Sequence, residues 1–166
     1  MQQSASTVLN PPMSEEISSE SGEKAPQTGP PADLFGADAF FRKNYDEAMA
    51  LLIEARNYIA YQESKDMAGL SPESRLLVSQ ETMRVTCRIT QIMAWMMCQR
   101  AWREGEIERK EALDDANKLG GESICLDDRF SADERLPTPI CSLLERTYSL
   151  YVRVQRLDGL IREAAG

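Results

Sequence analysis

The sequence predicts an all-α protein: an antiparallel three-helix bundle with a short extra helix and a loop between helices two and three, preceded by a disordered N-terminal tail. Apolar residues recur at intervals of three, four and seven along three long segments, which is the period of one helical face. Clusters of Gly and Pro separate these segments. No alternating pattern or hairpin dipeptide predicts a β-strand. At 166 residues, the chain has room for one domain with a real core.

The first 33 residues are the predicted tail. Residues 1–32 hold five of the eight prolines, six serines and four glutamates, against one lysine and no aromatic residue. Such a composition cannot bury enough apolar area to offset the entropy lost on ordering. We therefore expect a disordered tail over residues 1–33 and a helical bundle domain over residues 34–166.

The first helix is predicted over residues 34–64 and the second over residues 72–104. Ser71 is placed to cap the second helix, Pro72 suits its first position, and Gly105 marks its end. The apolar stripe of the first helix consists of Leu34, Phe41, Tyr45, Ala48, Leu52, Ala55 and Ile59. The stripe of the second consists of Val78, Thr82, Val85, Ile89, Ile92, Met93 and Met96.

The third long helix is predicted to end near Ala164, with Thr138 as its cap and Pro139 in its first position. Its stripe is the most regular of the three and consists of Ile140, Leu143, Leu144, Thr147, Leu150, Tyr151, Val154, Leu157 and Ile161. Before it, residues 107–119 have the spacing of a short helix that a Gly-Gly pair ends. Residues 122–136 are polar and acidic, and we expect a loop there.

The composition excludes several classes of chemistry. The chain has no histidine, which removes Ser-His-Asp and Cys-His catalysis and His-ligated metals. A formal net charge of -8 opposes binding to nucleic acid or to an anionic membrane surface. No apolar stretch approaches the ~20 residues of a spanning helix, and no signal peptide is recognisable. We therefore expect a cytoplasmic protein without cofactor or metal, and its four cysteines as free thiols in a reducing compartment.

Arginines on the second and third helices leave one enzyme class open. A small helical enzyme can bind a carboxylate substrate with inward arginines and use a Glu for electrostatic stabilisation, which needs no histidine. The alternative is structural: Arg84 and Arg88 pair with Glu81 or Glu145 and cover apolar surface with their stems. The arginines concerned are Arg75, Arg84, Arg88, Arg100, Arg103, Arg146, Arg153, Arg156 and Arg162.

The second helix is apolar over a wider arc than one neighbouring helix covers. Projection at about 100° per residue places Trp95 and Trp102 on one flank of its stripe and Met83 and Met97 towards the back. Such a helix is either central in its bundle or half of an interface between chains. We therefore take Trp95, Met97 and Trp102 as candidate contacts with a partner or within a dimer, with core packing as the alternative.

Strings of residues on all three predicted long helices resemble a known family. Residues 81–101, ETMRVTCRITQIMAWMMCQRA, are followed by Glu104-Gly105-Glu106. Residues 144–158, LERTYSLYVRVQRLD, follow Leu136-Pro137 and resemble the last helix of the family. The helix-one runs YDEAMAL and EARNY are similar too, although they are less specific. Together they resemble the alphaproteobacterial regulator-of-CtrA-degradation family, the RcdA-type proteins.

The resemblance implies a dimeric three-helix bundle that acts as a non-enzymatic adaptor. Such proteins help an AAA+ unfoldase-protease complex of the ClpXP type to capture cell-cycle regulators such as CtrA-type transcription factors. They work with a response-regulator-type adaptor at the cell pole. A purely self-associating structural protein is the remaining alternative. The C-terminal Ala-Ala pair resembles the ends that AAA+ unfoldases recognise, but the final Gly166 departs from that pattern, and we expect a fraying helix end.

Overall fold

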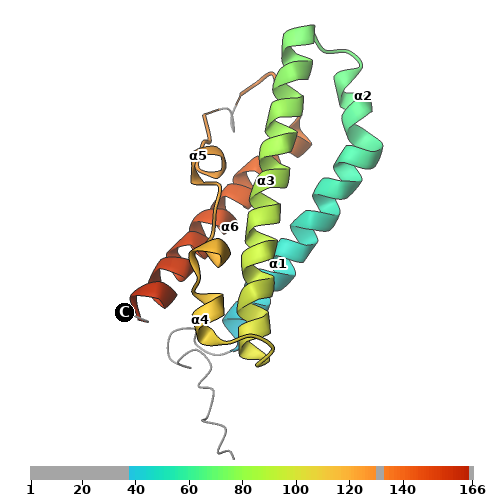
Figure 1. The fold of residues 1–166 in the computed structure, drawn as a ribbon. Coiled ribbons are helices and arrows are strands. Elements are labelled where there is room, and N and C mark those ends of the chain that lie inside the picture. Colours follow the sequence, from blue (N-terminus) through green and yellow to red (C-terminus); the bar gives the residue numbers. More distant parts are fainter. Residues whose placement is uncertain (1–37, 130–132, 165–166) are drawn as a thin grey trace, which may run out of the picture.

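The computed structural model describes residues 38–129 and 133–164. Within these ranges the chain is helical and contains no strand, which confirms the all-α class. Its three long helices are α1 (Asp38–Asn57), α3 (Pro72–Arg103) and α6 (Thr138–Glu163), and each contacts the other two (Figure 1). The predicted disordered tail and the C-terminal Ala-Gly end lie outside the described residues.

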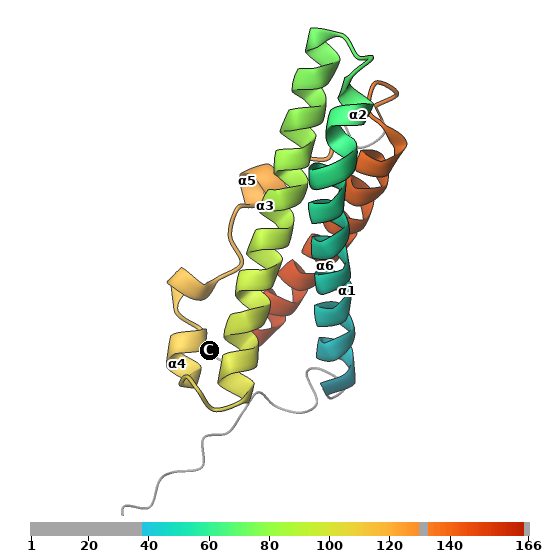
Figure 2. The ribbon, with the colours of Figure 1, turned by 90° about the vertical axis from the view of Figure 1, so that its right-hand side faces the viewer.

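The long helices do not all alternate in direction. α1 runs opposite to the other two, whereas α3 and α6 run the same way and cross obliquely (Figures 1 and 2). Hydrogen bonds follow this direction, because Arg88 of α3 reaches Leu144 of α6, and Trp95, further along α3, reaches Asp158, further along α6. The prediction of a wholly antiparallel bundle is therefore wrong for this pair. The chain between them, residues 104–137, therefore returns along the bundle before α6 begins. A short loop suffices only where the two neighbouring helices are antiparallel.

The first helical segment ends three residues later than predicted and is less uniform. α1 passes into a π-helical turn, η2 (Tyr58–Gln62), and then into α2 (Glu63–Met67). Leu51 and Tyr58 are buried, whereas Leu52 and Ile59, which the predicted stripe contained, are exposed. Phe41, Ala48 and Ala55 of the predicted stripe are buried, which confirms those positions. The prediction is wrong at Leu52 and Ile59, where the preceding residue is buried instead, so the segment has two adjacent apolar stripes.

The ends of α3 confirm their predicted signals, whereas the start of α6 does not. The hydroxyl of Ser71 accepts a hydrogen bond from the Ser74 amide at 3.2 Å, and Gly105 has a φ of 74° just after the helix. Thr138 was predicted as the cap of α6 but is its first residue, and Pro137 occupies the cap position.

The connection between α3 and α6 consists of short turns. The predicted helix over residues 107–119 is divided into α4 (Arg109–Ala112) and the 3₁₀ turn η3 (Asp115–Asn117). The division lies at Asp114, whose carboxylate accepts from the Ala116 amide at 2.9 Å and so caps a new turn in place of continuing the helix. α5 (Glu122–Cys125) lies where a loop was predicted, and it starts after Gly121, which has a φ of 80°.

The core lies where α1, α3 and α6 meet and includes side chains from the connection. Its most completely buried apolar members are Ala48, Val78, Val85, Ile92, Met96, Ala112, Cys125, Ile140, Leu143, Leu144, Leu150, Tyr151 and Val154. Because Ala112 and Cys125 belong to the connection, this segment is part of the packed structure. Within the described part of the chain, no helix is both long and apolar enough to cross a membrane.

The two glycines in the left-handed region provide a matched test of the connection. A Cβ on Gly121 would lie 3.2 Å from the Cys125 sulfur and 3.3 Å from Cγ of Gln91, whereas a Cβ on Gly105 meets nothing within 4 Å. Gly105→Ala should therefore lower the free energy of unfolding by only about 1 kcal/mol, the cost of placing alanine in the left-handed region. Gly121→Ala should lower it further, because the added Cβ would also push α5 away from α3. Urea unfolding followed by circular dichroism measures both, and equal losses would show that α5 does not pack closely on α3.

Candidate interaction surface

The outward side of α3 carries an apolar stripe without charge. Met83 is 70% exposed and Met97 is 61% exposed, and both lie on the side of α3 that faces solvent. Between them the exposed positions are small or uncharged, namely Thr86, Thr90 and Ala94. A long helix face without charged side chains is unusual for a solvated surface and typical of a contact surface.

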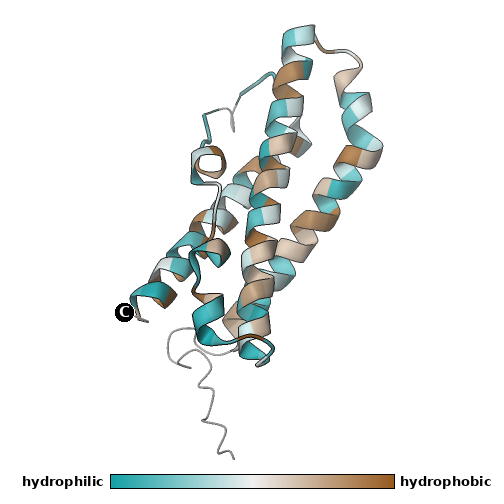
Figure 3. Cartoon of the chain, in the orientation of Figure 1, coloured by the Kyte–Doolittle hydropathy of each residue, from teal (hydrophilic) through white to brown (hydrophobic). Residues whose placement is uncertain are grey.

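A second apolar stripe on α1 and η2 lies beside the first. It contains Tyr45, Met49, Leu52 and Ile59, which follow one another at helical spacing. Figure 3 shows hydrophobic residues recurring along both α1 and α3. We call the surface formed by the two stripes the α1–α3 groove.

The α1–α3 groove has two hollows. One has a volume of about 330 Å³ and is lined by Leu52, Ala55, Arg56, Ile59, Ala60, Thr86, Ile89 and Thr90. The other, of about 230 Å³, lies towards the end of α3 and is lined by Tyr45, Met97, Arg100, Ala101, Glu104 and Glu106. The first hollow contains one charged residue, and the second contains three. The groove is therefore apolar in its middle and charged at one end.

Of the three residues predicted as partner or dimer contacts, only Met97 lies on this surface. Trp95 is 2% exposed and Trp102 is 5% exposed, so both are core residues of the single chain. The Trp95 indole donates to Asp158 Oδ1 at 2.8 Å, and that oxygen also accepts from Arg162 Nε at 3.0 Å. Helical projection placed the two tryptophans on a flank and Met97 towards the back, but it does not show that neighbouring segments of the same chain cover that flank of α3. A contact of Met97 with a partner stays a prediction.

Arg88 is buried and donates hydrogen bonds to main-chain oxygens. The predicted partner was a carboxylate, that of Glu81 or Glu145. Its Nε donates to the Cys125 carbonyl at 2.8 Å, one terminal nitrogen to the Leu144 carbonyl at 3.0 Å, and the other to the Asp127 carbonyl at 2.8 Å. Its guanidinium also lies 5.1 Å from the centre of the Tyr148 ring. Burial, together with the nearby charge of Arg84, lowers the pKa of Arg88 from its ordinary value. The side chain joins α3 to the connection and to α6.

Arg84 lies one turn earlier and binds two carboxylates. It donates to Glu81 at 2.9 Å, as predicted, and its terminal nitrogen lies 3.0 Å from Asp127 Oδ2. Hydrogen bonds from Arg129 and the charge of Arg84 hold the pKa of Asp127 well below its ordinary range. Arg84 and Arg88 are thus inward arginines, but groups of the same chain already bind their nitrogens.

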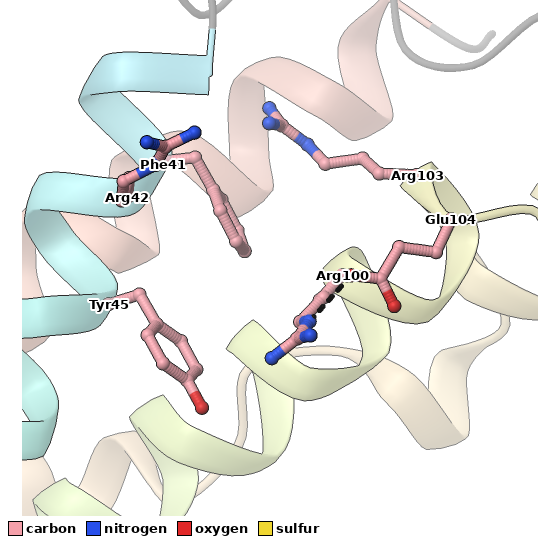
Figure 4. A pocket seen from close by; sticks show the side chains of 6 residues that line it. All are labelled: Phe41, Arg42, Tyr45, Arg100, Arg103 and Glu104. Atoms are coloured by element: carbon pink, nitrogen blue, oxygen red, sulfur yellow. Dashed lines mark hydrogen bonds and ion pairs between the residues drawn. The ribbon is translucent and has the colours of Figure 1, made fainter.

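A different set of arginines lines an open cleft at one end of α1 and α3. The cleft has a volume of about 460 Å³ and is lined by Phe41, Arg42, Tyr45, Arg100, Arg103 and Glu104 (Figure 4). Arg100 Nε donates to Glu104 at 2.8 Å, and the Arg103 guanidinium lies 4.4 Å from the centre of the Phe41 ring. Sequence reasoning did not bring Arg42 together with the other two arginines, because their proximity depends on how α1 pairs with α3. We call this site the arginine cleft.

The remaining polar clusters are structural. Among residues 38–129 and 133–164, no three His, Cys, Asp or Glu side chains are grouped so as to hold a metal ion. The four cysteines are free thiols, and the sulfurs of Cys87 and Cys125 lie 3.7 Å apart. Burial raises the pKa of the Cys125 thiol to about 12, which makes it a poor nucleophile at neutral pH.

Comparisons with known proteins identify related sequences and structures. Residues 33–166 match the family described as "Protein of unknown function (DUF1465)". Among solved structures, the chain is similar to RcdA from Caulobacter crescentus CB15, with 33% sequence identity and a TM-score of 0.59. That similarity covers 71% of this chain and 87% of the RcdA chain. A comparison with curated proteins finds no match.

Arg88 provides the second test. Arg88→Met should destabilise the fold by about 3 kcal/mol or more, because it leaves buried carbonyl oxygens without donors. Arg146→Met is the matched control: Arg146 pairs with Glu54, both side chains are close to half exposed, and the loss should stay below about 1 kcal/mol. Urea unfolding measures both. A loss for Arg88→Met no larger than for the control would contradict the structural role of Arg88.

Proposed function

The chain belongs to the DUF1465 family of RcdA-type proteins, and from this membership we propose that it is a protease adaptor. In this role it helps to deliver cell-cycle regulatory proteins, transcription factors of the CtrA type, to an ATP-dependent AAA+ protease of the ClpXP type. The adaptor itself catalyses no reaction. The observation that supports this role best is the α1–α3 groove, since a face along two helices that is apolar in its middle is suited to binding another protein.

The mechanism that we propose is tethering. An adaptor that binds cargo and a protease-bound partner at the same time raises the effective concentration of the cargo at the unfoldase, without altering any bond in it. The proposed partners are the AAA+ unfoldase-protease complex, a response-regulator-type adaptor and the cargo regulators, and the proposed place of action is the cell pole. Charged residues beside the apolar stripes, such as Arg56 and Glu54, would select among partners by charge.

We also propose that the protein is a homodimer and that the α1–α3 groove is the surface that two copies share. Exposed residues of both helices, among them Leu52, Met83 and Met97, then become buried. The apolar middle of the groove supports this assignment, because the centres of homodimer interfaces are more apolar than the remaining surface.

The arginine cleft favours a second candidate function, a helical enzyme that binds a carboxylate substrate. It contains three arginines and one glutamate, the combination that this function needs. The side chains of Arg100 and Glu104 are, however, about half exposed and paired with each other. Electrostatic catalysis depends on groups held in a water-excluded site, so an open cleft of this kind is better suited to binding than to catalysis.

Self-association can be tested on the α1–α3 groove. We expect the native protein to be a dimer and Leu52→Glu combined with Met97→Glu to be a monomer, because the two carboxylates would be desolvated at the interface. Ile124→Glu is the control, since Ile124 is a similarly exposed apolar residue on α5. Light scattering coupled to size-exclusion chromatography measures the mass, and circular dichroism verifies the fold. A native monomer, or a double variant that remains dimeric, would contradict the assignment.

The adaptor role can be tested by affinity isolation from the organism's own cells. We expect the tagged protein to recover the AAA+ unfoldase, a response regulator and transcription factors. Recovery should increase in a strain whose protease is trapped in a form that does not cleave, because cargo then stays bound. Recovery of the tagged protein without the unfoldase, in both strains, would contradict the adaptor role.

A further inference from the structure

We propose that Cys87 of α3 and Cys125 of α5 form a reversible disulfide bond when hydrogen peroxide oxidises Cys87, and that this bond fastens the connection to α3. The inference does not depend on the adaptor role, because it concerns two side chains of a single chain. It rests on the contact between the two sulfurs, on the difference in their exposure and on the hydrogen bonds that hold α5 against α3.

The two sulfurs are already in contact. They lie 3.7 Å apart, although the two residues are 38 positions apart in the sequence. Atoms of this size touch at such a separation, so a bond requires only a small approach of the side chains. The other two thiols lie beside main-chain oxygens. The sulfur of Cys98 is 4.0 Å from the Ala112 carbonyl, and the sulfur of Cys141 is 3.8 Å from the Leu136 carbonyl. The fold therefore selects one pair among the four cysteines.

Hydrogen bonds from residues on both sides of Cys87 keep α5 in this position. Arg84 donates to the Ile124 carbonyl at 3.0 Å. Arg88 donates to the carbonyl of Cys125 itself at 2.8 Å. Because these bonds involve the main chain of α5, they bring the Cys125 side chain to α3 whatever the state of its thiol. The contact between the sulfurs is therefore a consequence of how the connection is attached.

The two thiols differ in their access to solvent. Cys125 is 0% exposed, whereas Cys87 is partly exposed. Burial raises the pKa of the Cys125 thiol to about 12, so this thiol stays protonated and does not meet an oxidant in solution. Cys87 is thus the residue at which oxidation begins, and Cys125 is the group that completes the bond.

The reaction balances with one molecule of hydrogen peroxide. Cys87 loses its proton, its sulfur attacks one peroxide oxygen, and the O–O bond breaks. The departing hydroxide takes up a proton and becomes water, which leaves a sulfenic acid on Cys87. The Cys125 sulfur then attacks the Cys87 sulfur, and the hydroxyl leaves as water with the proton of the Cys125 thiol. Two electrons pass from the two thiols to the peroxide, and the products are one disulfide and two water molecules.

The bond attaches the connection to α3 by a covalent link. It closes a loop of 38 positions that contains the second half of α3, α4 and η3, and it restricts the unfolded chain over this length. In a reducing compartment such a pair is reduced at rest and oxidised transiently, because small thiols reverse the disulfide by exchange. The protein then has two states that differ in how firmly the connection is held.

Peptide mapping after oxidation tests the pairing, because trypsin places each cysteine on a separate peptide. Cys87 lies on residues 85–88 and Cys125 on residues 119–129. The full-length protein is treated with hydrogen peroxide, its remaining thiols are alkylated in concentrated urea, and the digest is analysed by mass spectrometry. We expect residues 85–88 and 119–129 to be joined, and two of the four thiols to be alkylated. Treatment with dithiothreitol should separate the joined peptides.

Three variants provide the matched comparison, and circular dichroism verifies the fold of each. Cys98→Ser combined with Cys141→Ser removes the other two thiols and should form the bond as the native protein does. Cys87→Ser should leave Cys125 reduced and open to alkylation after the same treatment. Cys125→Ala removes the second thiol, so the sulfenic acid on Cys87 should persist. Dimedone, which traps sulfenic acids, should then label residues 85–88 in this variant and not in the native protein.

The melting temperature tests whether the native fold accommodates the bond. The oxidised protein should melt about 5 °C or more above the reduced protein, because the bond restricts the unfolded chain. The variant without Cys98 and Cys141 should show the same rise, and Cys87→Ser should show none. An unchanged or lower melting temperature of the joined protein would overturn the proposal. So would a joined peptide no more abundant than those of other cysteine pairs, or Cys87 oxidised to the sulfinic acid while Cys125 remains a free thiol.

Discussion

The hydrogen bonds of Arg88 are the interaction on which the arrangement of this bundle depends. Because α3 and α6 run in the same direction, the chain must return along the bundle through residues 104–137, which contain only short turns of helix. Main-chain carbonyls in such a segment have few partners of their own. Arg88 supplies donors to Cys125 and Asp127 of the connection and to Leu144 of α6. One side chain therefore holds three segments in place, and its charge tolerates burial because the carbonyl dipoles surround it.

Arg84 and Tyr151 extend this attachment along the connection. Arg84 donates to the Ile124 carbonyl at 3.0 Å and pairs with Glu81 and Asp127, and the Tyr151 hydroxyl donates to the Gly120 carbonyl at 2.7 Å. Near the other end, Arg162 of α6 donates to the Leu113 carbonyl at 2.8 Å. Side chains on the long helices thus bind carbonyls at successive points of the connection. This explains how the connection, of which residues 122–136 were predicted as a loop, contributes Ala112 and Cys125 to the core.

Signals local in the sequence predicted the long helices. Contacts between residues distant in the sequence determine the direction of α6 and which apolar residues are buried. The limits of α3 were predictable because Ser71, Pro72 and Gly105 act within one turn of the helix. The direction of α6 was not predictable in this way, because it depends on the path of the connection and on hydrogen-bond donors from α3. The prediction for α1 failed at Leu52 because Leu51 and Leu52 are both apolar, and only the positions of α3 and α6 decide which of them is buried. In the same way, the surrounding helices make Trp95 and Trp102 core residues and leave Met97 exposed.

The same helix pair provides two surfaces of different chemistry. Along the middle of α1 and α3, the residues that line the groove are mostly apolar, because α1 carries a second, exposed apolar stripe beside its buried one. At the end of the pair, arginines lie beside the partly buried ring of Tyr45 and the buried ring of Phe41 near the start of α1. Apolar contact is insensitive to salt and requires complementary shape, whereas the arginines attract carboxylates over a longer range. A helix pair with both surfaces can therefore bind one segment by charge and another by shape, although Tyr45, Arg100 and Glu104 line both the arginine cleft and the charged end of the groove.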